Sequence, residues 1–144
     1  MKKIVYIDMD GVLADFAKGV GREFSGKPKE MYKKDFYLNL PVMQGAREAI
    51  NALLLQDDLD LYIASKPTTR NTWSVKEKYD WIKLFFPELT KKIFLTCNKN
   101  LLKGDYLVDD HPEKWENFQG EVLSFDSKDP LRSWTTIVNR LLRR

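Results

Sequence analysis

A short apolar run that ends in two aspartates constrains the fold of this chain more than any other feature. The run Ile4–Ile7 consists of β-branched and aromatic residues, which favour a strand, and Asp8 and Asp10 follow it with one residue between them. Carboxylates are uncommon in strands, so a pair at the end of one is typical of a chemical site. Gly11 then permits a sharp turn and a close approach of a ligand to the backbone. The segment therefore predicts a strand whose end carries function.

The rest of the sequence alternates between strand-like and helix-like patterns, which is typical of a parallel sheet covered on both faces. We expect a three-layer, Rossmann-like α/β fold with a five-stranded parallel sheet. The predicted strands are Lys3–Asp8, Leu59–Ala64, Ile93–Leu95, Tyr106–Asp109 and Glu121–Phe125. The predicted helices, whose apolar residues recur at helical spacing, are Ala46–Gln56, Val75–Phe86 and Leu131–Leu142.

One segment, Phe16–Gln44, is far longer than the usual connection between a strand and a helix. It is rich in aromatic residues and lysines, which makes a small helical cap more plausible than disorder. We therefore expect a single domain over residues 1–144, with a cap inserted at residues 16–44.

Composition excludes several classes of protein. The formal charge of +3 at pH 7 suits small anionic substrates but falls short of a nucleic-acid-binding surface, so no stable nucleic-acid partner is expected. A single cysteine, Cys97, excludes an internal disulfide. The first apolar run breaks at Asp8, too early for a signal peptide, and no stretch approaches the length of a membrane span. A cytoplasmic enzyme with no membrane partner is the expectation.

Polar residues follow the predicted strands at the ends where α/β sheets bind ligands. They are Asp8 and Asp10 after the first strand, Ser65 after the second, Lys99 after the third, and Asp109 with Asp110 at the fourth. Together they supply what phosphoryl transfer needs. A carboxylate that attacks a phosphate dianion meets like-charge repulsion, so a metal ion and a lysine are required to offset it.

Each of these residues therefore has an expected role. Asp8 is the candidate nucleophile, and Asp10 is the candidate acid and base for the leaving group and the incoming water. Mg²⁺, which prefers oxygen ligands, is expected on Asp8, on the carbonyl of Asp10 and on an acid after the fourth strand. Ser65 and Lys99 are expected to donate to the phosphoryl oxygens.

The ordered set DMDGV, Ser65, Lys99 and DD resembles the four motifs of the haloacid-dehalogenase-type phosphatases. The segments "DMDGVLADF", "EKYDWIKLFFP", "CNKNLLKGDYLVDDHP" and "SFDSKDPLRSW" narrow the resemblance to the 5′(3′)-deoxyribonucleotidases. It covers nearly the whole chain except residues 17–35. The resemblance implies an aspartyl-phosphate formed on Asp8, phosphate binding by Ser65 and Lys99, and Asp110 as the acid that reaches the metal, with Asp109 as its neighbour. The order of these two acids stays open.

The resemblance also implies that Phe16 lines the nucleoside pocket, where aromatic faces stack on bases. Two departures bear on substrate choice. The cap is shorter than in the animal enzymes and lacks their tryptophan-bearing segments, and Lys66 stands where those enzymes carry a small hydroxyl residue.

The expected function is thus a Mg²⁺-dependent phosphatase of deoxyribonucleoside or ribonucleoside monophosphates. One alternative keeps the chemistry but acts on other small phosphate esters or on nucleic-acid 3′-phosphate ends. Another is a non-enzymatic receiver-like domain, which would carry an acid after its third strand, where this chain has Leu95-Thr96-Cys97. A homodimer is left open.

Overall fold

The computed structural model describes residues 1–143, and Arg144 lies outside the described part. A five-stranded, all-parallel sheet forms its centre, in the order β3-β2-β1-β4-β5. The strands are β1 (Lys3–Ile7), β2 (Leu59–Ser65), β3 (Ile93–Leu95), β4 (Tyr106–Asp109) and β5 (Glu121–Ser124). The chain moves outward from β1 to β3 and then returns to β4 on the other side of β1. This reversal between β1 and β4 is where sheets of this kind bind ligands.

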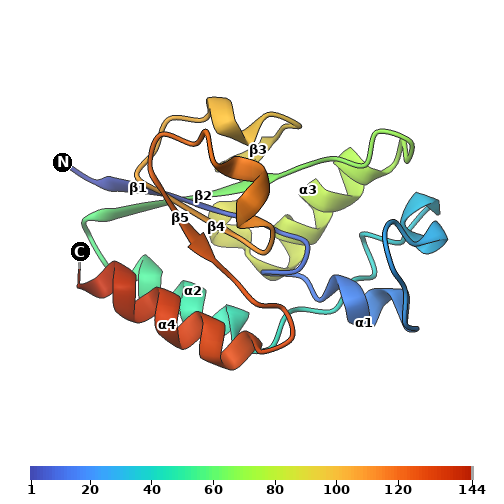
Figure 1. Cartoon of the computed structure of the whole chain (residues 1–144), viewed down its shortest axis with the longest axis horizontal. Coiled ribbons are helices and arrows are strands. Elements are labelled where there is room, and N and C mark those ends of the chain that lie inside the picture. Colours follow the sequence, from blue (N-terminus) through green and yellow to red (C-terminus); the bar gives the residue numbers. More distant parts are fainter. Residues whose placement is uncertain (144) are drawn as a thin grey trace.

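Three α-helices cover one face of the sheet. They are α2 (Ala46–Leu54), α3 (Ser74–Phe85) and α4 (Pro130–Leu142), and Figure 1 shows α2 and α4 lying side by side beneath the strands. The main hydrophobic core lies between these helices and the sheet, and it contains Val5 and Ile7 of β1, which are fully buried. Trp134 of α4 belongs to the same core because it lies on that helix's apolar stripe.

The other face of the sheet is covered by shorter elements. Successive strand residues point to opposite faces of a sheet, and those that point to this face, such as Tyr6 and Leu107, pack against Trp115 and Phe118. Trp115 belongs to the 3₁₀ helix η4 (Pro112–Trp115), and η3 (Lys99–Leu101) lies in the connection from β3 to β4. A third 3₁₀ helix, η2 (Pro87–Leu89), follows α3 and contributes Leu89 to the main core on the first face. The expected α/β fold with helices on both faces is confirmed.

The segment between β1 and α2 holds α1 (Phe16–Val20) and the 3₁₀ helix η1 (Lys29–Tyr32). Asp15 begins α1 by accepting a hydrogen bond from the Lys18 N–H at 3.1 Å, and Gly21 ends it at a φ of 77°. Figure 1 places α1 toward the end of the molecule where the strands end. Tyr37 and Leu40, farther along this segment, belong to the main core.

The predicted elements agree with the structure to within two residues. The largest difference lies at the end of α2, which stops at Leu54 instead of Gln56 because the Gln56 N–H turns back to the carbonyl of Leu53. Among the helices of residues 1–143, none is long and apolar enough to cross a bilayer.

Candidate active site

The central position of β1 brings charged residues from distant parts of the chain to one place. Asp8 follows β1 directly, and its N–H continues the ladder by donating to Val108 of β4 at 2.9 Å. The ammonium of Lys99, in η3, donates to Asp8 Oδ1 at 2.9 Å and to Asp109 Oδ2 at 2.7 Å. All three side chains are nearly fully buried. Asp109 also accepts a hydrogen bond from the His111 N–H, so its orientation is fixed on both sides.

Asp110 completes this acidic group, and Gly11 makes room for it. Gly11 has a φ of 80°, and a Cβ at this position would overlap the carboxylate oxygen Oδ2 of Asp110. Only glycine therefore satisfies both the backbone conformation and the close approach. Single carboxylate oxygens of Asp8, Asp109 and Asp110 lie within 4.8 Å of one another.

The protonation equilibria reflect the crowding of negative charge. Burial and the charge of Asp8 raise the pKa of Asp110 to about 9. The same two causes raise the pKa of Asp109, against the opposing effect of Lys99. Burial alone would lower the pKa of Lys99, but the charges of Asp8 and Asp109 together raise it. Lys99 is therefore a permanent cation among three carboxyl groups.

This arrangement fits a divalent cation. Three carboxyl groups share one ammonium, so ionising all three leaves negative charge uncompensated in a mostly buried place. Oxygen ligands of this kind are those that Mg²⁺ prefers. The donor set thus agrees with the metal that the motifs predict.

The charge imbalance predicts the effect of Asp110→Asn on the metal-free protein. The folded protein keeps a proton on Asp110 that the unfolded chain has already lost, so its stability falls as pH rises from about 4 to about 9. The substitution should raise the free energy of unfolding by about 2 kcal/mol at pH 8, and by less at pH 5. Urea unfolding in EDTA at both pH values tests this, with the exposed Asp57→Asn as control. Mg²⁺ should raise the free energy of unfolding of the parent protein and leave that of Asp110→Asn unchanged. Equal stabilisation of both proteins would contradict the assignment of Asp110 as a metal ligand.

A second polar group, centred on Lys78, lies beside the first. The Lys78 ammonium donates to Asp10 Oδ2 at 2.8 Å, to Ser65 Oγ at 2.8 Å and to the carbonyl of Lys66 at 2.7 Å. Lys78 is 1% exposed and Ser65 is fully buried. Within the described residues, the other oxygen of Asp10, Oδ1, is buried without a hydrogen-bond partner. Asp10 therefore has one oxygen held by Lys78 and one oxygen that is unengaged.

Lys78 is the member of this group to which the sequence assigned no role, although it lies in the segment "EKYDWIKLFFP". A signal for it exists in the spacing of α3, whose buried positions follow one helical face: Ser74, Glu77, Lys78, Trp81 and Ile82. Two charged residues within such a face are unusual, because a buried charge needs a partner. A lysine in the buried face of a helix next to a predicted site is thus a sequence signal that could have identified Lys78.

Phe16 lies apart from the acidic group, within an aromatic cluster of the segment between β1 and α2. Its ring centroid is 5.3 Å from Phe36, 6.0 Å from Phe24 and 6.4 Å from Tyr37. Tyr37 connects this cluster to the polar site, since its ring lies 4.7 Å from the ammonium of Lys78 and its hydroxyl bonds with the hydroxyl of Thr68. The predicted site residues thus fall into two groups. One contains Asp8, Lys99, Asp109 and Asp110, and the other contains Asp10 and Ser65, which Lys78 joins. Phe16 is connected to this second group through Tyr37.

Comparison with known proteins bears on this geometry. A Staphylococcus epidermidis protein named "Putative 5′(3′)-deoxyribonucleotidase" is 33% identical over 83% of this chain and 66% of its own length. A Staphylococcus aureus protein of the same name is 32% identical, over 86% and 82%. The mitochondrial 5′(3′)-deoxyribonucleotidase of Mus musculus is 30% identical, over 76% and 64%. The chain thus spans about two thirds of the length of the first and third of these relatives.

The match to a protein family covers most of the chain. Residues 26–134 match the family described as 5′ nucleotidase, deoxy (pyrimidine), cytosolic type C protein. The matched range contains Ser65, Lys78, Lys99, Asp109 and Asp110, while Asp8 and Asp10 precede it. The three relatives are 30% identical or more over at least 76% of this chain. The chain therefore belongs to the 5′ nucleotidase, deoxy (pyrimidine), cytosolic type C family.

Proposed function

We propose that this protein is a Mg²⁺-dependent phosphatase that hydrolyses nucleoside monophosphates, as a 5′(3′)-deoxyribonucleotidase, through an aspartyl-phosphate on Asp8. The observation that carries the proposal is the placement of Asp8, Asp109 and Asp110 at the ends of two adjacent parallel strands, with Lys99 of η3 bonded to Asp8 and Asp109. Membership in a nucleotidase family and the names of the relatives support the substrate class.

The carboxylates of Asp8 and Asp110, with the backbone carbonyl of Asp10, would hold the Mg²⁺. Asp109 is the less suitable ligand because its two oxygens already accept hydrogen bonds from Lys99 and from the His111 N–H. When bound, the ion supplies positive charge that offsets the repulsion between Asp8 and the phosphate. The role proposed for Asp109 is to hold Lys99 in place.

Asp8 is suited to act as the nucleophile because one of its oxygens is fixed. Lys99 and the Met9 N–H both donate to Oδ1, so the carboxylate has a single orientation and Oδ2 is the attacking atom. The Oδ2–phosphorus bond forms as the bond from phosphorus to the ester oxygen breaks. Lys99 and Ser65 are proposed to stabilise the charge on the phosphoryl oxygens.

Asp10 is proposed to move the protons. Asp10 would begin the cycle protonated and give the proton from its unengaged Oδ1 to the departing nucleoside oxygen; as the resulting carboxylate, it would take a proton from water in the second step. The resulting hydroxide attacks phosphorus, the bond to Asp8 Oδ2 breaks, and inorganic phosphate leaves. Lys78 keeps Asp10 in position for both steps by its hydrogen bond to Oδ2.

The base and sugar would be held by the segment between β1 and α2. In this proposal residues 16–44 form a cap inserted in a single domain. Phe16 is the proposed stacking residue, and Phe36 and Tyr37 extend the same aromatic cluster toward the phosphate site. A cytoplasmic location and a homodimer stay predictions.

A substrate panel tests the proposal. Steady-state rates of phosphate release from dUMP, dTMP, ribonucleotides, sugar phosphates and 3′-phosphorylated oligonucleotides should be measured with and without Mg²⁺. We expect turnover of nucleoside monophosphates that disappears when the metal is removed. Equal rates on every small ester would favour the broader phosphatase, and a preference for oligonucleotides would favour the end-trimming one. A single stoichiometric phosphorylation without turnover would indicate a receiver-like domain.

A further inference from the structure

A buried glutamate of α3, which the reaction does not use, fastens the cap segment to the site. Glu77 is 5% exposed, and its carboxylate accepts two backbone hydrogen bonds from that segment. The Asp35 N–H donates to Oε2 at 2.7 Å, and the Tyr37 N–H donates to Oε1 at 3.2 Å. Asp35 has a φ of 70°, a conformation that residues other than glycine rarely adopt, and its N–H is the donor to Oε2 of Glu77.

Two neighbours of Glu77 hold the rest of the segment. The Asn71 amide donates to the carbonyls of Met31 and Lys33, and the Trp81 indole N–H donates to the carbonyl of Leu40. Residues 71–81 therefore bind the backbone of residues 31–40 at three points. In Figure 1 the start of α3 and the cap segment lie toward the same end of the molecule. Glu77 makes the middle attachment, the one next to Tyr37.

The attachment of Tyr37 matters because of what its side chain touches. Its ring lies over the Lys78 ammonium, 4.7 Å from it, and Lys78 in turn holds Asp10 and Ser65. Glu77 and Lys78 are consecutive residues, so the same turn of α3 fixes the cap backbone and the site. A ring placed on an ammonium stabilises it electrostatically and also excludes water from it.

We infer that Glu77 is a positioning residue: by holding the backbone at residues 35–37 it keeps Tyr37 on Lys78, and thereby keeps Asp10 in its working position. This inference rests on the proposed phosphatase function. The inference goes beyond the proposed function because it assigns part of the reaction rate to Glu77, a residue that does not contact the phosphate.

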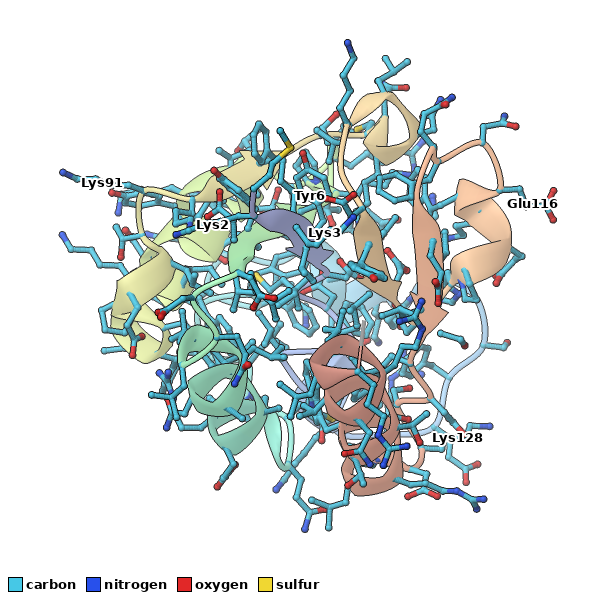
Figure 2. The ribbon with its side chains drawn as sticks, turned by 90° about the vertical axis from the view of Figure 1, so that its left-hand side faces the viewer. Lys2, Lys3, Tyr6, Lys91, Glu116 and Lys128 are labelled. Atoms are coloured by element: carbon cyan, nitrogen blue, oxygen red, sulfur yellow. The ribbon has the colours of Figure 1, made fainter. Side chains whose placement is uncertain are left out.

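The test uses Glu77→Gln, which keeps the shape of the side chain but places an NH₂ group against a backbone N–H. Glu116→Gln is the matched control, since Glu116 directly follows η4, is exposed, and projects outward in Figure 2. In Glu77→Gln, hydrogen exchange of peptides covering residues 31–40 should be faster by about tenfold, while peptides from β1 and β4 exchange as before. kcat/KM for dUMP should fall by about tenfold or more, mainly through kcat.

A double-mutant cycle separates positioning from general loosening. Tyr37→Leu by itself should lower kcat/KM to a similar extent without faster exchange of the residue 35–37 amides. If Glu77 acts through Tyr37, Glu77→Gln should cost less than about twofold in the Tyr37→Leu background. Fully additive losses, or Tyr37→Leu with parent kcat/KM, would overturn the inference.

The exchange measurement needs no turnover, so the proposed phosphatase function and the positioning role of Glu77 can be contradicted separately. Absence of phosphate release by the parent protein across the panel counts against the proposed function. Unaltered exchange in Glu77→Gln counts against the role of Glu77, whatever the activity. Faster exchange with unchanged kcat/KM would reduce Glu77 to a structural residue.

Discussion

Asp8→Asn should lower kcat for nucleoside monophosphates by at least about a thousandfold while leaving the fold intact. The amide is nearly the same size as the carboxylate, so it still fits between Lys99 and the Met9 N–H, but it is not a nucleophile toward phosphorus. Removing one of the three crowded acids also relieves repulsion, so the metal-free variant should unfold at a temperature at least as high as the parent. Phosphate release and thermal unfolding measure the two effects.

The control for this variant is Asp57→Asn, a change of the same chemistry at an exposed position. It should retain parent activity. Trapping with a labelled substrate followed by acid quenching should also find phosphate bound to the parent protein and none bound to Asp8→Asn. An Asp8→Asn protein that turns over at the parent rate would end the proposed mechanism.

Lys78→Met is the second substitution with a large expected effect. Methionine has a similar length but cannot donate, so Asp10 loses the bond to Oδ2, and Ser65 and the Lys66 carbonyl lose the same donor. We expect kcat to fall by about a hundredfold, within the range that general acid–base catalysis contributes. We also expect a loss of about 1–3 kcal/mol in the free energy of unfolding, because buried acceptors are left without a donor.

Lys91→Met provides the matched control for Lys78→Met. Lys91 is exposed, and Figure 2 shows it projecting away from the protein body. The control should change neither kcat nor stability beyond a few tenths of a kcal/mol. If Lys78→Met lost stability but kept its kcat, Lys78 would be a structural residue and Asp10 would be positioned by other contacts.

The positions of the helices and strands were predictable because local periodicity carries them. The apolar run of β1 and the i, i+3, i+4 spacing of α4 are properties of neighbouring residues, and they identify buried residues without knowledge of the partner. Ends were less exact, as at Leu54, because the last turn depends on backbone bonds that no side-chain pattern encodes.

The acidic group was predictable for a related reason. Asp8 and the pair Asp109-Asp110 each follow an apolar run directly, and the carboxyl ends of parallel strands share one edge of a sheet. Their closeness therefore needed only the assumption of a parallel sheet. The partners of Lys99 were not predictable in this way, because its bonds to Asp8 and Asp109 depend on where η3 packs beside the two strand ends; its binding of phosphate stays a prediction.

The pairing of Lys78 with Asp10 spans 68 residues and depends on how α3 is turned above β1 and β2. Glu77 likewise reaches a backbone about 40 residues away in a segment without regular structure. From the sequence alone, then, come the kinds of elements, their order and the chemical groups at the strand ends, because these depend on neighbours along the chain. Which cation holds which carboxylate, and which residue fastens the cap, was decided only when packing fixed the rotation of each helix and brought distant side chains within hydrogen-bonding distance.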